Sequence, residues 1–120
     1  MREILFRGKR KVCDEWVYGF PFISRKSKYK IKWYDGYYGS SKTSEIYPES
    51  IGQFTGLTDK NGKKIFDGDI LKWEAEEWGK EYCEPVVWDY SFLGVRQNDW
   101  QEFCEVIGNI HDNPELLESP

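Results

Sequence analysis

The stretch QFTGLTDKNGKKIFDGDILKW, Gln53–Trp73, decides the fold. An Asn-Gly pair separates two short strand-like runs, and this pair is typical of a tight hairpin turn, either a two-residue type I′ turn or a type I turn with the glycine in a bulge. An Asp-Gly-Asp turn follows, and then a third strand-like run, Ile70–Trp73. The residues expected in turns are Asn61, Gly62, Asp67, Gly68 and Asp69. The stretch therefore predicts a hairpin, a turn and a strand.

Further strand-like segments lie on both sides of this stretch. They are Glu3–Gly8, Glu15–Ile23, Lys28–Tyr34, Pro85–Tyr90, Leu93–Arg96 and Glu102–Ile110. The acidic run Glu74–Lys80 is expected to be an exposed loop, and the PELL sequence that begins at Pro114 is expected to form a short C-terminal helical turn. Aromatic residues make up 18% of the chain, and such residues suit a pleated sheet. The sequence thus predicts a mainly-β fold in one domain, residues 1–120.

The segment Lys28–Tyr38 holds the candidate binding surface. Lys28–Tyr34 alternates in polarity, and Asp35-Gly36 follows, which predicts a two-residue turn that places Tyr34 opposite Tyr37. Residues directly opposite across a hairpin share a face. The face expected in the core carries Tyr29, Ile31, Trp33 and Tyr38. The face expected in solvent carries Lys28, Lys30, Lys32, Tyr34 and Tyr37. Lysines beside aromatic rings are the side chains of a single-strand binding platform, although lysines also serve simply to solvate an exposed hairpin face.

Patterns typical of catalysis or metal binding fail when their spacing is checked. A calcium loop that begins at Asp59 needs Gly and Glu where the chain has Lys64 and Ile70, so a hairpin turn explains Asp59 better. Asp67 and Asp69 could converge as a carboxylate pair, but turn residues that bond to local backbone explain them better. The sequence contains no nucleophile elbow, P-loop or dinucleotide fingerprint. We therefore expect no catalytic residues, no metal site and no cofactor.

The cysteine content, the hydrophobic pattern and the net charge indicate which classes of protein are unlikely. Three cysteines, Cys13, Cys83 and Cys104, are widely separated and odd in number, which favours reduced, mostly packing thiols. Neither a signal peptide nor a membrane helix is indicated, so the cytoplasm is the expected location. The net charge of −4 argues against strong nucleic-acid binding, yet residues 1–60 carry +5 and residues 61–120 carry −9. This asymmetry motivates the hypothesis of an interaction surface.

Three blocks of the chain carry a family resemblance. They are REILFRGK from Arg2, IGQFTGLTDKNGKKIFDGDILKW from Ile51 and EVIGNIHDNPELL from Glu105. Together they resemble the YopX-like proteins, a family typical of bacteriophages and prophages. The resemblance implies a small, mainly-β, intracellular protein and supplies no catalytic residues. The pattern that ends in DGDILKW also resembles the opening of an SH3-like barrel, so we expect hairpins arranged in a partly open barrel of that kind.

Two functions remain open at this point. The leading hypothesis is a non-enzymatic phage or prophage accessory protein that acts by protein–protein contact or self-assembly, motivated by aromatic content and charge asymmetry. The alternative is a weak single-stranded nucleic-acid-binding module that uses the lysine and tyrosine side chains of the Lys28–Tyr38 hairpin.

Overall fold

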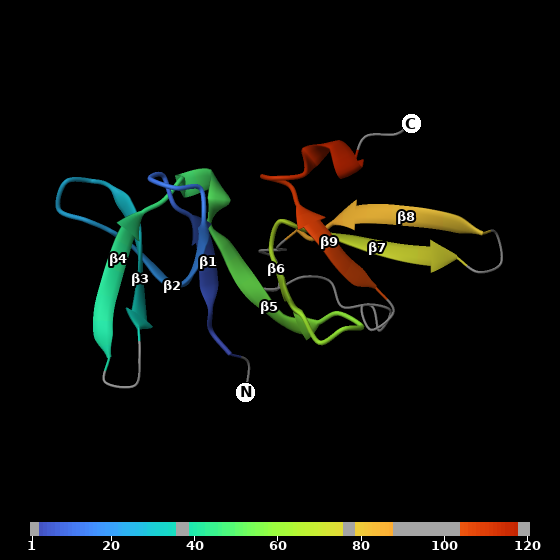
Figure 1. The fold of residues 1–120 in the computed structure, drawn as a ribbon, viewed down its shortest axis with the longest axis horizontal. Coiled ribbons are helices and arrows are strands. Elements are labelled where there is room, and N and C mark those ends of the chain that lie inside the picture. The colour runs from blue at the N-terminus through green and yellow to red at the C-terminus, as the bar shows by residue number, and fades with distance from the viewer. Residues whose placement is uncertain (1–2, 36–38, 76–78, 88–103, 118–120) are drawn as a thin grey trace. The chain divides into compact units, whose positions relative to one another are not determined.

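The computed structural model describes residues 3–35, 39–75, 79–87 and 104–117 (Figure 1). The chain divides into two compact units, Met1–Phe54 and Thr55–Pro120. Antiparallel strands dominate both units, which confirms the predicted mainly-β fold, and the described residues form no closed barrel. The SH3-like character and the single domain over residues 1–120 stay predictions.

The first unit is an antiparallel sheet with the strand order β4-β3-β2-β1-β5. Its elements are β1 (Phe6–Lys9), β2 (Trp16–Ile23), β3 (Tyr29–Asp35), β4 (Ser40–Glu45), the short 3₁₀ helix η1 (Pro48–Ser50) and the start of β5 (Gly52–Thr58). The first half of β2 pairs with β1 and its second half pairs with β3. Gly19 lies at this changeover, where a Cβ atom would collide with the backbone carbonyl oxygen of Lys32. A residue without a side chain is therefore needed where the two pairings meet.

The core of this unit is built around two isoleucines. Ile31 of β3 and Ile46, which forms an isolated bridge with Arg10, are both fully buried. Gly8 leaves room for Ile46, because a Cβ atom there would lie 2.6 Å from Ile46 Cδ1. Ser44, also buried, accepts a hydrogen bond of 3.0 Å from Arg10 Nε. The buried side of the sheet is thus apolar at Ile31 and Ile46, with the Arg10–Ser44 hydrogen bond beside them.

The predicted register of the Lys28–Tyr38 hairpin was wrong. Asp35 ends β3 and pairs with Ser40, so residues 36–39 connect the strands instead of a two-residue Asp35-Gly36 turn. Tyr34 lies opposite Ser41, not Tyr37, and Trp33 lies opposite Lys42, not Tyr38. Six cross-strand pairs form in this register, along the Ser/Thr-rich β4 that the sequence pattern did not predict. The longer ladder outweighs the local turn preference of Asp-Gly. Gly36, Tyr37 and Tyr38 lie outside the described residues.

The second unit continues from β5. Its elements are β6 (Lys64–Phe66), β7 (Asp69–Ala75), β8 (Lys80–Pro85), β9 (Glu105–Asn109) and the 3₁₀ helix η3 (Pro114–Leu117). β6 pairs with β5, and the other strands form a sheet in the order β8-β7-β9. The buried cluster consists of Ile65, Leu71, Val86, Cys104 and Val106, with Leu57 and Trp73 packed against it. The predicted C-terminal helical turn is confirmed as η3.

The acidic run Glu74–Lys80 was predicted to be a loop, and this was wrong for Glu74, Ala75 and Lys80, which lie in strands, whereas Gly79 lies in a turn. Glu74 lies in β7, and β8 begins at Lys80 and pairs with β7 along its length. Trp73 stacks on Tyr82 across this hairpin, with ring centroids 4.4 Å apart, and Lys72 Nζ lies 3.2 Å from Glu81 Oε1. These cross-strand pairs stabilise the two strands, although the acidic sequence of the segment favours an exposed loop over a strand. The predicted strand Leu93–Arg96 and the second half of Pro85–Tyr90, residues 88–90, lie outside the described residues. In the first half, Pro85 ends β8, and Val86 and Val87 follow that strand without belonging to one.

Asp59 links the central turn to the last strand. Its Oδ1 accepts hydrogen bonds from the backbone N–H groups of Asn61 (2.8 Å) and Lys63 (2.9 Å), and its Oδ2 accepts one from Val106 (2.9 Å). Gly62 donates to the Asp59 carbonyl oxygen and has a φ of 79°, which selects the turn with glycine in a bulge. Burial raises the pKa of Asp59, but the three N–H donors together outweigh it and leave this pKa below its usual value.

The three cysteines, all in the described part of the chain, form no disulfide and differ in their surroundings. Cys13 is exposed, Cys83 is half-buried and Cys104 is fully buried. Burial, with a smaller effect from Glu84, raises the pKa of Cys104 to about 11. The prediction of packing cysteines therefore fits Cys104 and does not fit Cys13.

The three thiols should differ in reactivity because the thiolate is the reactive form. In native protein at pH 8, a thiol-specific reagent should modify Cys13 rapidly and leave Cys104 unmodified. Peptide mass mapping identifies the sites, and Cys13→Ser should remove the fast phase. Modification of Cys104 at the rate of Cys13 in folded protein would contradict this assignment.

Candidate binding face

The pairing of β2 with β3 brings aromatic rings next to lysines. Phe20 lies opposite Lys32, and Phe22 lies opposite Lys30. Opposite residues in an antiparallel pair share a face, and Tyr34 shares the face of Lys32 because it is two residues further along the strand. Lys32 Nζ lies 5.7 Å from the centroid of the Tyr34 ring, which agrees with this placement. We call Phe20, Phe22, Lys30, Lys32 and Tyr34 the aromatic–lysine face.

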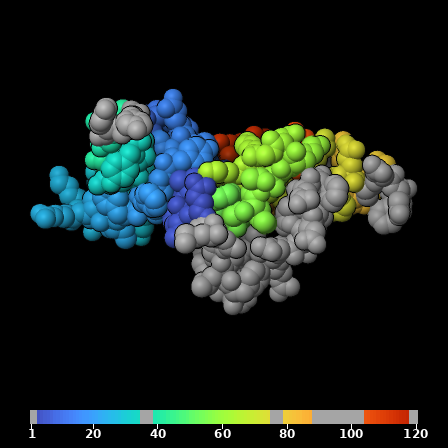
Figure 2. All heavy atoms as spheres, turned by 90° about the horizontal axis from the view of Figure 1, so that it is seen from below, coloured from blue at the N-terminus to red at the C-terminus, as the bar shows by residue number. Residues whose placement is uncertain are grey.

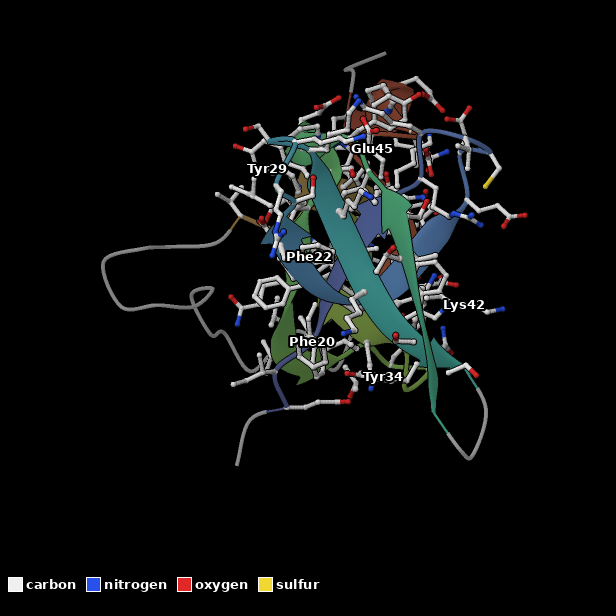
Figure 3. All side chains as sticks on the ribbon, turned by 90° about the vertical axis from the view of Figure 1, so that its left-hand side faces the viewer. Phe20, Phe22, Tyr29, Tyr34, Lys42 and Glu45 are labelled. Atoms are coloured by element: carbon white, nitrogen blue, oxygen red, sulfur yellow. The ribbon has the colours of Figure 1, made fainter. Side chains whose placement is uncertain are left out.

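The rings of this face are open to solvent. Phe20 is 50% exposed, Phe22 39% and Tyr34 61%. Figure 3 shows Phe20 and Phe22 on one side of the strands, away from Lys42. The two lysines are half-buried. Their aliphatic stems are therefore partly covered, which still allows the charged ammonium groups to reach water. A cluster of exposed rings is unusual, because phenylalanine normally belongs to the core.

A basic turn adjoins the face. Residues 24–28 connect β2 to β3 and protrude from the sheet, as the light-blue atoms in the space-filling view show (Figure 2). The Lys28 backbone carbonyl accepts a hydrogen bond from Ser24 N–H, and Ser24 Oγ accepts one from Lys28 N–H. Arg25 and Lys26 in this turn are exposed. The turn thus adds cationic side chains beside the end of β2 that carries Phe22.

One carboxylate lies at the border of the face. Glu45 is opposite Lys30 in β4, and its oxygens lie 2.9 Å from Lys11 Nζ and 3.5 Å from Lys28 Nζ. The hydrogen bond and charge of Glu45 raise the pKa of Lys11. The hydrogen bond from Lys11 lowers the pKa of Glu45 against the opposing effect of burial. Glu45 is therefore an ionised carboxylate bound by two cations.

The other face of β3 provides a natural comparison. Alternation places Tyr29, Ile31 and Trp33 there, and the register places Lys42 opposite Trp33. Ile31 is buried, and the guanidinium of Arg10 lies 5.8 Å from the Trp33 ring centroid. Tyr29 is 42% exposed. Tyr29 and Lys42 are thus an aromatic residue and a lysine of the same sheet that do not belong to the aromatic–lysine face.

The structure brings together only part of the surface that the sequence predicted. Lys30, Lys32 and Tyr34 lie on one face of β3. Lys28 precedes β3 and is engaged by Glu45, and Tyr37 lies outside the described residues. Sequence reasoning missed Phe20 and Phe22. The alternation of aromatic residues in β2 is a visible signal, but it does not say that β3 is the strand next to them or in which register.

The acidic turn residues occupy structural positions. Asn61, Gly62, Asp67 and Gly68 lie in turns. Asp69 is the first residue of β7 and not a turn residue, because its backbone pairs with Asn109 while its buried carboxylate accepts a 2.7 Å hydrogen bond from Phe66 N–H. Within the part of the chain that the structure describes, no three His, Cys, Asp or Glu side chains are grouped as metal ligands.

Comparisons with known proteins identify a family and similar solved structures. The model of the family described as YopX protein matches residues 5–118. The crystal structure of protein EF1440 from Enterococcus faecalis is similar at a TM-score of 0.62 and 26% identity, and the match covers 98% of this chain and 100% of that chain. No curated protein matches. None of the described helices has the length and apolar character needed to span a bilayer.

Proposed function

Because this chain belongs to the YopX protein family, we propose that it is a non-enzymatic phage or prophage accessory protein that binds a macromolecule through the aromatic–lysine face. The observation that carries the proposal is the exposure of Phe20, Phe22 and Tyr34 around two lysines on one sheet face. Leaving three rings in water forgoes the free energy of burying them, and exposed apolar clusters with polar surroundings are typical of interaction sites. The proposed site of action is the cytoplasm of the host cell.

Two classes of ligand fit a face of this kind. A protein partner, or a second copy of the chain, is favoured by the exposed phenylalanines, since aromatic residues are enriched in protein interfaces. A single-stranded nucleic acid is favoured by the lysines that lie opposite the same rings.

The net charges of the two units affect how strongly the face attracts either class of ligand. The unit that holds the face has eleven Lys/Arg and six Asp/Glu, a net +5, and the other unit has six and fifteen, a net −9. The face therefore lies on the unit that attracts anionic ligands.

Site-specific photocrosslinking in bacterial cells tests whether the face binds at all. A photoreactive phenylalanine analogue is placed at Phe20 or Tyr34, with Tyr29 on the opposite face and Leu117 in η3 as exposed controls. We expect adducts at Phe20 and Tyr34 in several-fold excess over the controls, because only these positions lie in the proposed contact. Thermal unfolding checks that each substituted protein is folded. Equal adduct yields at face and control positions would refute the proposed function.

A further inference from the structure

We infer that the ligand of the aromatic–lysine face is a single-stranded nucleic acid; the inference rests on the proposed role of this face as a binding surface. Three features support this ligand: the spacing of the rings, the position of the lysines and the charge of the unit. The sequence offers this ligand only as the alternative, on the lysines and tyrosines of the Lys28–Tyr38 hairpin, and the pairing of β2 with β3 adds Phe20 and Phe22 to that surface.

The rings are arranged as a stacking platform. Phe20 and Phe22 project from the same side of one strand, about 7 Å apart along it, as residues two positions apart do. Tyr34 supplies a third ring from the neighbouring strand. Exposed rings on a sheet offer their surfaces to unstacked bases, and any base can stack because each has a π-face. Bases inside a duplex are already stacked on one another, so the platform suits a single strand.

The lysines are placed to neutralise the backbone of such a strand. Each phenylalanine has a lysine directly opposite it, Lys32 for Phe20 and Lys30 for Phe22. A base stacked on either ring would therefore have a cation beside its phosphate. The exposed Arg25 and Lys26 in the adjoining turn add positive charge next to Phe22. Glu45 would repel a phosphate near Lys30, but Lys11 and Lys28 bind its carboxylate.

The same lysines disfavour a protein partner as the main ligand. Lysine is depleted from the buried centres of protein interfaces, because its ammonium group is costly to dehydrate there. A protein that covered Phe20 and Phe22 would also cover Lys30 and Lys32 on the neighbouring strand. A nucleic acid supplies a phosphate for each ammonium group while its bases cover the rings.

Fluorescence anisotropy with a labelled oligothymidylate of about 12 nucleotides tests the inference directly. We expect saturable binding at about 50 mM salt that weakens as salt rises. Phe20→Ala with Phe22→Ala should lower the affinity at least about tenfold, because two stacking surfaces are lost. Lys30→Gln with Lys32→Gln should reduce the slope of log affinity against log salt by about 1.4, since two phosphates lose their cations.

Matched controls come from the opposite face of the same sheet. Tyr29→Ala and Lys42→Gln should leave the affinity within about twofold of the wild type, because rings and charges away from the face make no stacking or phosphate contact. A duplex of the same sequence should bind more weakly than the single strand. Circular dichroism and thermal unfolding identify any variant that fails to fold, and Tyr34→Ala then replaces the phenylalanine pair as the test.

The outcomes separate this inference from the proposed function. Absence of oligonucleotide binding at low salt, or equal losses in the face and control variants, would overturn the inference. If binding is absent while Phe20 and Tyr34 still crosslink selectively to protein in cells, the face binds a protein and only the ligand class is wrong. Selective crosslinks to nucleic acid at those positions, together with the expected losses of affinity, support both.

Discussion

Asp59→Asn should destabilise the protein by about 2–4 kcal/mol, although the substitution keeps the shape of the side chain. Asp59 is only 5% exposed, and both of its oxygens accept backbone hydrogen bonds. In asparagine one of the two carboxylate oxygens is replaced by an NH₂ group, which donates and cannot accept. This NH₂ group then faces either the N–H groups of the turn or the N–H group of Val106, and the hydrogen bonds on that side are lost. Because Val106 lies 47 residues away in the chain, loss of this contact also frees β9 from the turn. Denaturant unfolding measures the effect.

Two further measurements make this result specific. Glu115→Gln removes an exposed carboxylate in η3 and should change stability by less than about 0.5 kcal/mol. The pKa of Asp59 is lower in the folded protein than its usual 3.8, so its contribution to stability is complete above that pH and is lost as pH falls through the folded value. The acid side of the stability curve should therefore be flatter in Asp59→Asn than in the wild type. The same acid slope in both proteins would contradict the assignment.

Gly19→Ala should cost about 3 kcal/mol and weaken the pairing of β2 with β3. A Cβ atom at this position collides with the backbone carbonyl oxygen of Lys32, which no side-chain rotation can relieve, and Trp33 Cβ lies 3.2 Å away. The backbone of β3 must shift, and the aromatic–lysine face shifts with it. Oligonucleotide affinity should therefore fall in this variant even under conditions in which it remains folded.

A glycine in open space is the matched control for this substitution. Gly39 has a φ of 71°, and a Cβ atom added there would have no other atom within 4 Å, so Gly39→Ala carries only the backbone strain, about 1–2 kcal/mol. Thermal unfolding compares the two variants with the wild type. A smaller loss for Gly19→Ala than for Gly39→Ala would mean that the close approach of β2 and β3 does not constrain the sheet.

Only part of the aromatic–lysine face could be predicted from the sequence, because the strand next to β3 and its register are not local properties. The alternation of Lys30, Lys32 and Tyr34 is a local property of one strand, and period-two patterns are visible in any extended segment. The Asp-Gly pair after this alternating run predicts a two-residue turn at Asp35, and the six pairs between β3 and β4 override that preference. Phe20 and Phe22 belong to another strand. Whether they join the lysines depends on register, and a slip of one residue would move them to the opposite face.

The sequence by itself determined the mainly-β class, the family and the central hairpin with its turn at Asn61 and Gly62. These features depend on local chemistry: alternation, β-branched and aromatic content, and glycine where φ is positive. Only the tertiary structure decided that Asp59 accepts from Val106, and that Phe20 and Phe22 lie opposite Lys32 and Lys30. Such contacts join distant segments, and their free energy depends on how strands pair in space. The aromatic–lysine face, which β2 and β3 form together, can therefore be identified only once the pairing and register of these two strands are known.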